Sequence, residues 1–326
     1  MLCVLWGVPY FFIKLALAEL SPAVVAWSRL ALAALVLMPI AIHRDVLRSA
    51  MRHKAAIIAF AITELVIPFS LISVGELWIS SSMAGILVAT VPLVVVLVAP
   101  AVGVRERIGT RRLFGLLAGF VGVIVLLGID PIRGLHQWLG VLCIFGAVIG
   151  YAVGPLIVQR YLSDVDELGA LSASLVVSAL ILLPWAAWTA PTSMPSPLVI
   201  GSVATLGVFC TALALLLYFF LINDAGAARA SVVAYICPAI AALLGVLVLH
   251  EPFGIGMVTG LALILFGSWL GTGGVKRSVS PELQASRLGD DSAPTDQSGQ
   301  RVHLNWSAGD SSAPPSTRAV RVSPSR

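Results

Sequence analysis

The apolar part of this chain is an internal repeat of two copies, and this duplication constrains its fold more than any other feature. When residue n is compared with residue n + 145, landmarks coincide: Trp6 with Tyr151, Lys14 with Gln159, Pro39 with Pro184 and Glu106 with Glu251. Glycines coincide as well: Gly115, Gly122 and Gly128 with Gly260, Gly267 and Gly273. Each copy holds an odd number of apolar stretches, so in a membrane the second copy must be inverted relative to the first.

The composition places both copies in a lipid bilayer. Of the 326 residues, 59% are hydrophobic and 11% are charged, whereas a soluble domain carries about a quarter charged residues. The net charge of +4 comes from residues in short loops beside apolar stretches, so we expect no nucleic-acid partner. Inverted repeats in a membrane are typical of secondary transporters, which bind their solute at the repeat interface near the bilayer midplane.

The apolar stretches predict an all-α integral membrane fold. A spanning helix needs about 20 mostly apolar residues, and ten such stretches occur, at 2–18, 22–42, 55–74, 82–103, 112–129, 137–157, 168–190, 198–222, 230–249 and 254–272. We expect ten transmembrane helices as two inverted five-helix repeats, at 1–129 and 130–274. Residues 275–326 are rich in Ser, Pro, Asp and Arg, which predicts a disordered cytoplasmic tail.

Lysine and arginine in the loops predict the orientation. The loop 43–54 carries four of them and the loop 104–111 carries three, whereas the opposite side has only Arg133. Cytoplasmic loops are enriched in these residues. We therefore expect a multi-pass protein of the plasma (inner) membrane with both termini in the cytoplasm. No cleavable signal peptide is expected, and the abrupt apolar beginning leaves open whether Met1 is the true start.

The sequence contains no motif for an enzyme or an ATP-driven pump. It has no Gly-x-Gly-x-x-Gly, no Walker-type lysine loop and no His-Glu-x-x-His. The four cysteines lie in apolar runs without a Cys-x-x-Cys pair, so we expect no metal and no cofactor. An intramembrane prenyltransferase would need two acidic clusters, and only one is present, at 164–167.

Several motifs resemble one known family. The first copy holds Trp6-Gly7, Lys14 and Arg29, and the second holds its strongest match between Ala230 and Gly273, including Pro238 and Leu249-His250-Glu251-Pro252. Over residues 1–274 the chain resembles EamA-type carriers of the drug/metabolite transporter superfamily. The resemblance implies ten helices, two inverted repeats and movement of small metabolites by alternating access. It implies no particular substrate.

Glu64 is the sharpest candidate for chemistry. It lies in the middle of the predicted helix 55–74, roughly 13 Å from each surface at 1.5 Å per residue. Ionisable groups at such depth usually face a cavity or a partner and mark solute or proton paths. Glu64 is therefore our candidate for substrate binding and for coupling, with Lys14 as its expected partner. The alternative is a neutral carboxyl that fixes helix packing.

Three side chains share one face of the first predicted helix, because Trp6, Tyr10 and Lys14 are spaced by four residues. Tyr151 repeats this stripe in the second copy, and Tyr235 precedes Pro238 by one turn. We expect these residues to line a substrate site. Lys14 could instead extend to the outer surface.

Other polar and small residues have a structural interpretation. We expect Arg29 to be a packed side chain that extends toward the outer interface. Glu106 and Glu251 lie at helix ends and are expected to accept hydrogen bonds there. The glycines of 112–129 and 254–272 predict close helix contacts.

These observations predict a secondary-active transporter of small metabolites or drugs, working as an exporter by alternating access. Its expected partners are the small-molecule substrate and the lipid bilayer, and a homodimer is left open. The alternative is a membrane receptor or assembly factor that uses a transporter-like scaffold without transport.

Overall fold

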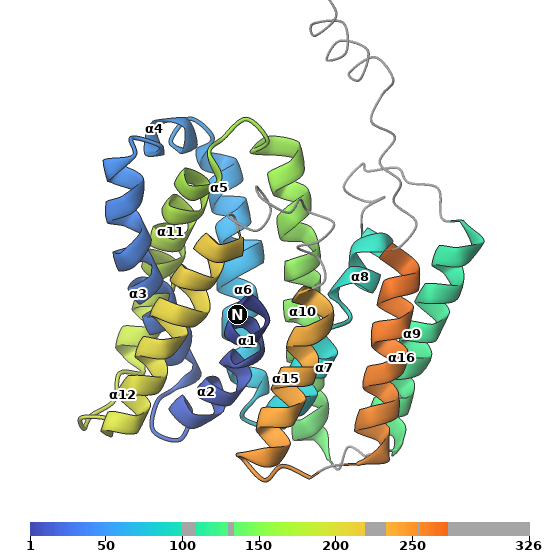
Figure 1. Cartoon of the computed structure of the whole chain (residues 1–326). Helices are drawn as coiled ribbons and strands as arrows, with labels where there is room; N and C mark the ends of the chain where they lie inside the picture. The colour runs from blue at the N-terminus through green and yellow to red at the C-terminus, as the bar shows by residue number, and fades with distance from the viewer. Residues whose placement is uncertain (99–108, 130–133, 219–232, 253, 273–326) are drawn as a thin grey trace, which may run out of the picture. The chain divides into compact units, whose positions relative to one another are not determined.

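The computed structural model describes residues 1–98, 109–129, 134–218, 233–252 and 254–272. Within these ranges the regular structure is entirely helical (Figure 1). The helices are α1 (Leu2–Gly7), α2 (Pro9–Ala16), α3 (Pro22–His43), α4 (Leu47–Ala50), α5 (Lys54–Phe60), η1 (Ala61–Val66), α6 (Ile67–Gly75), α7 (Ser81–Val88), α8 (Val91–Val98), α9 (Thr110–Ile129), α10 (Leu135–Tyr161), α11 (Glu167–Trp188), α12 (Pro197–Ala204), η2 (Thr205–Leu213), α15 (Val233–Leu247) and α16 (Ile255–Thr272).

Six helical stretches in the described residues are long and apolar enough to cross a membrane: Pro22–His43, Lys54–Gly75, Ser81–Val98, Leu135–Tyr161, Glu167–Trp188 and Pro197–Tyr218. Four shorter apolar helices accompany them, at Leu2–Ala16, Leu113–Gly128, Ile236–Leu247 and Ile255–Leu270. Each of these stretches overlaps one predicted range. The all-helical membrane fold is thus confirmed, while the ten-helix inverted repeat stays a prediction.

The helix starts follow the local sequence. Ser21 and Ser80 precede α3 and α7, and each side chain accepts a hydrogen bond from the backbone N–H three residues on. Ser196 does the same for α12, and Asp166 does so for α11. Serine and aspartate favour this position because their oxygens satisfy N–H groups that the helix leaves unpaired.

Glycines bring α9 and α16 into close contact (Figure 1). A methyl group added to Gly122 would lie 2.8 Å from the backbone nitrogen of Ile264 and 2.9 Å from the carbonyl oxygen of Gly260. Side chains larger than hydrogen would therefore separate the two backbones. The predicted contact through small residues is confirmed.

Helix contacts in the first half have counterparts in the second. The stretch of α5, η1 and α6 contacts α10, and the stretch of α12 and η2 contacts α2. The contact between α1 and α15 corresponds to the contact between α10 and α8. In the same way, the contact between η1 and α11 corresponds to the contact between η2 and α3. Two π-helical segments also correspond, because η1 moved by 145 residues gives 206–211, inside η2.

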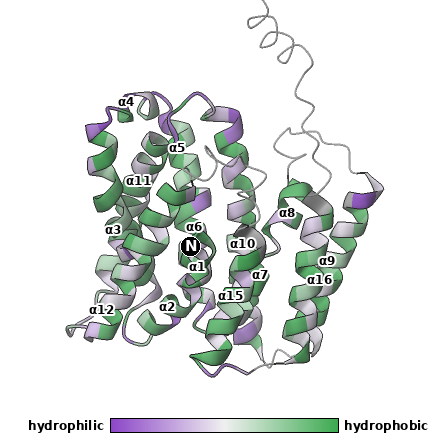
Figure 2. Cartoon of the chain, viewed as in Figure 1, coloured by the Kyte–Doolittle hydropathy of each residue, from purple (hydrophilic) through white to green (hydrophobic). Residues whose placement is uncertain are grey.

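The outward surface is apolar. Many large hydrophobic side chains are exposed, among them Leu35, Phe114, Ile124 and Leu180. Figure 2 shows the helices mainly in the hydrophobic colours, with hydrophilic residues concentrated toward the helix ends. Exposed apolar residues around apolar helices are what a lipid-facing surface requires.

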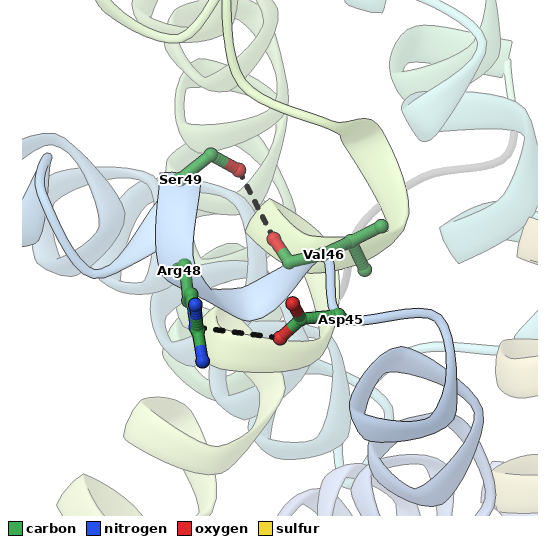
Figure 3. Close-up of polar contacts among 4 residues, drawn as sticks. All are labelled: Asp45, Val46, Arg48 and Ser49. Carbon is green, nitrogen blue, oxygen red and sulfur yellow. Dashed lines mark hydrogen bonds and ion pairs between the residues drawn. The ribbon is translucent and has the colours of Figure 1, made fainter.

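The loop between α3 and α5 is polar and solvent-exposed (Figure 3). Arg48 Nε lies 3.5 Å from Asp45 Oδ1, and both side chains are more than two-thirds exposed. The Ser49 hydroxyl donates to the Val46 carbonyl at 3.0 Å. An ion pair this exposed contributes little stability.

Candidate functional site

Glu64 lies in the π-helical segment η1, in the middle of an apolar helical stretch. Its Oε2 atom is buried and has no hydrogen-bond partner among the described residues. Gly154 of α10 makes room for it, since a methyl group there would lie 2.9 Å from the Glu64 Cβ. π-Helical turns inside α-helices are frequent at functional sites. One oxygen of this buried carboxyl group is therefore left without a partner among the described residues.

Tyr10 and Tyr151 lie near buried charged groups. Tyr151 is within electrostatic range of Glu64 and of Arg29, and Tyr10 is within range of Tyr151 and Arg29. Tyr10 also lies beside Gly85 of α7, where a methyl group would come within 3.3 Å of its ring. The two phenol groups, one from each copy, thus lie in one charged neighbourhood.

Lys14 does not pair with Glu64, so that expectation is wrong. Its ammonium group donates to the backbone carbonyls of Glu76 and of Ile79, the latter at 2.9 Å. It therefore neither reaches Glu64 nor extends to the surface. Lys14 instead satisfies backbone carbonyl oxygens in the segment between α6 and α7, beginning at Glu76, the residue that caps α6. The C-terminal end of a helix also favours a nearby cation.

Glu76 is a functional candidate that the sequence analysis missed. It is fully buried, and neither carboxyl oxygen has a hydrogen-bond partner among the residues described. Lys14, Glu251 and Arg29 lie within its electrostatic range. The available signal was the apolar run Leu77-Trp78-Ile79 directly after it, which shows that position 76 is not in a polar loop.

Glu251, between α15 and α16 of the second copy, binds the start of α7 in the first copy. Its carboxylate accepts hydrogen bonds from the backbone N–H groups of Ser81 and Ser82, at 2.7 and 2.9 Å, and from the Ser82 hydroxyl. This places a carboxylate at the N-terminus of α7, where unpaired N–H groups favour an anion. The predicted helix-end role is confirmed for Glu251, and Glu106 lies outside the described residues.

Arg29 is buried rather than extended toward the interface, which corrects our expectation. It is 8% exposed, its guanidinium carbon lies 4.1 Å from the centre of the Phe69 ring, and its Nε donates to Thr211 Oγ1 at 2.8 Å. Thr211 belongs to η2 and in turn donates to the Leu206 carbonyl. Arg29 of the first copy thus binds the π-helical segment of the second.

The other two predicted site residues lie differently. The Trp6 ring packs against the Tyr218 ring, with centroids 4.9 Å apart, inside an apolar cluster that includes Leu2 and Ala214. Tyr235 lies in the first turn of α15, and its side chain is outside the described part of the structure. The structure thus brings Tyr10 and Tyr151 close to Arg29, and places Trp6 in a neighbouring apolar contact.

The acidic cluster at 164–167 belongs to a loop and a helix start. Asp166 accepts from the Gly169 N–H at the start of α11, and Asp164 lies 3.9 Å from His53. The described residues contain no group of three or more His, Cys, Asp or Glu side chains that could hold a metal ion.

Comparison with known proteins gives a consistent result. The model of the EamA-like transporter family matches residues 1–128 and 138–272. An uncharacterised transporter of Archaeoglobus fulgidus is 26% identical over 81% of this chain and 94% of its own length. The uncharacterised transporter YvbV of Bacillus subtilis is 25% identical over 81% of this chain and 87% of its own length.

The uncharacterised inner membrane transporter YedA of Escherichia coli strain K12 is 26% identical over 75% of this chain and 79% of its own length. A solved crystal structure of a protein superposes with a TM-score of 0.61 at 19% identity, covering 88% of this chain and 96% of that one. The last likeness concerns the fold alone.

Proposed function

We propose, from the fact that this chain belongs to the EamA-like transporter family, that it exports small metabolites or drugs as a secondary-active carrier. The chain is a multi-pass membrane transporter, as the family and the relatives indicate. The proposal adds the direction, the mechanism and the site. The solute binds between the two copies, and the carrier exposes it to each side of the membrane in turn.

The single observation that carries this proposal is the buried Oε2 atom of Glu64, which has no hydrogen-bond partner among the described residues. A carboxylate buried without hydrogen bonds is costly, so this group is either protonated or matched by a cation that comes and goes. No described side chain serves as that cation. Glu64 is thus proposed as the coupling residue, which takes up a proton or a solute amine in one state and releases it in the other.

Two further observations support a site between the copies. The π-helical segments η1 and η2 occupy corresponding positions, and one carries Glu64 while the other carries Thr211. π-Helical turns leave backbone groups free and bend a helix, which are properties that a solute site inside a membrane uses. Tyr10 and Tyr151 are proposed to contact the solute there. The proposed site also includes three further residues expected from the sequence, namely Trp6, Lys14 and Tyr235.

Solute flux tests the proposal. Metabolite profiles of cells with and without the protein identify compounds that accumulate inside when it is missing. The purified full chain in proteoliposomes should then move those compounds across the membrane, and empty liposomes serve as the control. If no compound changes in the cells and none crosses in the liposomes, the chain is not a carrier, and a receptor or assembly role becomes the better explanation.

A further inference from the structure

Arg29 is a buried cation deep in the helical bundle. It is seven residues from the start of α3, roughly 10 Å along the helix at 1.5 Å per residue. It is 8% exposed. A guanidinium group at this depth carries a large desolvation cost unless it has an anionic partner. The question is which group provides the negative charge.

The protein itself supplies no close counter-ion among the described residues. The ion pairs there, within 4 Å, are Arg48 with Asp45 and His53 with Asp164, and neither involves Arg29. Thr211 accepts from Nε and is neutral, and this is the hydrogen bond that Arg29 makes to a described side chain. Glu76 is the carboxylate within electrostatic range, and Lys14 acts on it more strongly than Arg29 does.

The neighbours of Arg29 come from both copies. Phe69 of the first copy lies under the guanidinium plane, and Thr211 of the second holds Nε. Tyr10 and Tyr151, again one from each copy, are within electrostatic range. The Phe69 ring and the Nε bond hold the guanidinium group in place, and the two Nη groups of an arginine form the planar fork that binds carboxylates in a bidentate manner.

We propose that Arg29 binds the carboxylate of the transported solute, so that the substrates of this carrier are organic anions. The inference rests on the proposed function, because it assigns a chemical class to the solute of that same site. The Nη donors hold the two carboxylate oxygens, and Phe69 and Thr211 keep the guanidinium group in position. The phenol groups of Tyr10 and Tyr151 lie near enough to contact the rest of the solute.

Binding to the purified full chain tests this directly. The probes are benzoate, 3-phenylpropionate and succinate, each paired with its neutral amide, and inorganic phosphate as a separate arm. Affinity is measured from the ligand-induced change in unfolding temperature and from tryptophan fluorescence. At least one carboxylate should bind the parent about tenfold or more tightly than its amide, as expected for a charge-assisted bidentate contact.

Three variants at the site and one control variant separate binding from folding. Arg29→Gln should lose the preference for carboxylate over amide, and Arg29→Lys should weaken carboxylate binding about tenfold while keeping the charge. Thr211→Val removes the Nε contact but leaves the fork, so it should retain most of the preference. Arg48→Gln, which changes an exposed loop arginine, should bind like the parent.

The inference is overturned if no carboxylate is preferred over its amide by the parent, or if Arg29→Lys and Arg29→Gln both bind it like the parent. It is also overturned if phosphate alone binds at Arg29 as tightly as the best carboxylate, since the site would then hold an inorganic anion. If Arg29→Gln does not fold, two other results decide the question: the carboxylate affinity of Arg29→Lys, and the ratio of carboxylate to amide affinity in the parent.

Flux distinguishes this inference from the proposed function. If the protein carries neutral or cationic solutes and Arg29→Gln carries them equally well, transport stands and the assignment of Arg29 is wrong. If carboxylates bind at Arg29 but no solute crosses the membrane, the assignment stands and the carrier function is wrong.

Discussion

Replacing Glu251 with alanine should destabilise the protein strongly, although this residue lies in a connection between two helices. Its carboxylate accepts from the backbone N–H groups of Ser81 and Ser82, and both serines are fully buried. Without it, these two N–H groups lose their acceptor at the start of α7. Each buried donor left unsatisfied costs about 1–3 kcal/mol.

At about 2 kcal/mol for each donor, the middle of that range, the two donors together cost about 4 kcal/mol. This corresponds to roughly a thousandfold change in the folding equilibrium. Glu251→Gln keeps one acceptor oxygen and removes the charge, so about half of this loss is expected. Gly245 lies beside the same carboxylate, and a methyl group there would lie 2.9 Å from the Ser81 hydroxyl, so the surroundings of the carboxylate are tightly packed.

Equilibrium unfolding in mixed micelles, followed by circular dichroism, measures the free energy of unfolding of each variant. Glu19→Ala is the matched control. Glu19 also accepts from a backbone N–H that starts a helix, that of Ser196 at 2.6 Å, but on the exposed surface. Hydrogen bonds from the Ser196 side chain and backbone lower the pKa of Glu19, and solvent can replace them. If Glu251→Ala unfolds like Glu19→Ala, the account of α7 is wrong.

Three further predictions concern topology, the tail and packing. A single cysteine at position 48, an exposed loop site (Figure 3), should not react with an impermeant reagent in intact cells, whereas cysteines at 133 and 193 should; the reverse pattern would overturn the orientation. A chain that stops after Arg277 should insert and transport like the full protein, because residues 278–326 have no apolar face; lost flux at normal expression would reveal a role for them. Gly154→Ala should cost about 1–3 kcal/mol of stability, because a methyl group there would overlap the Glu64 carboxyl group, whereas Gly201→Ala, where nothing lies within 4 Å, should cost little; equal effects would contradict the packing seen at Glu64.

The sequence predicted the helices well because their signal is local. An apolar run of sufficient length forms a helix in a membrane whatever its neighbours are, and the observed stretches overlap the predicted ranges. The helix-end role of Glu251 was also predictable, because its position after an apolar run points to a helix terminus. The serines that it binds were not, since they lie about 170 residues earlier in the chain.

The site was less predictable because it depends on which helix faces meet. Lys14 and Glu64 belong to the same copy, yet Lys14 binds the carbonyl groups of residues 76 and 79, after the end of α6. Arg29 looked like an interfacial residue from its depth alone, and only the packing of α3 against η2 shows that it points inward. Arg29 and Thr211 are 182 residues apart, and a contact over such a separation produces no local pattern in the sequence.

Flux through the Glu64→Gln variant tests the central claim most directly. Glutamine keeps the size and hydrogen-bonding capacity of glutamate but cannot carry charge or titrate. The variant should therefore fold and reach the membrane, yet lose transport or lose its dependence on pH. Expression, flux and the pH profile of flux are measured on one preparation, with Glu167→Gln at the start of α11 as the control. Flux that matches the parent at every pH would show that Glu64 is only a packing residue and would contradict this account.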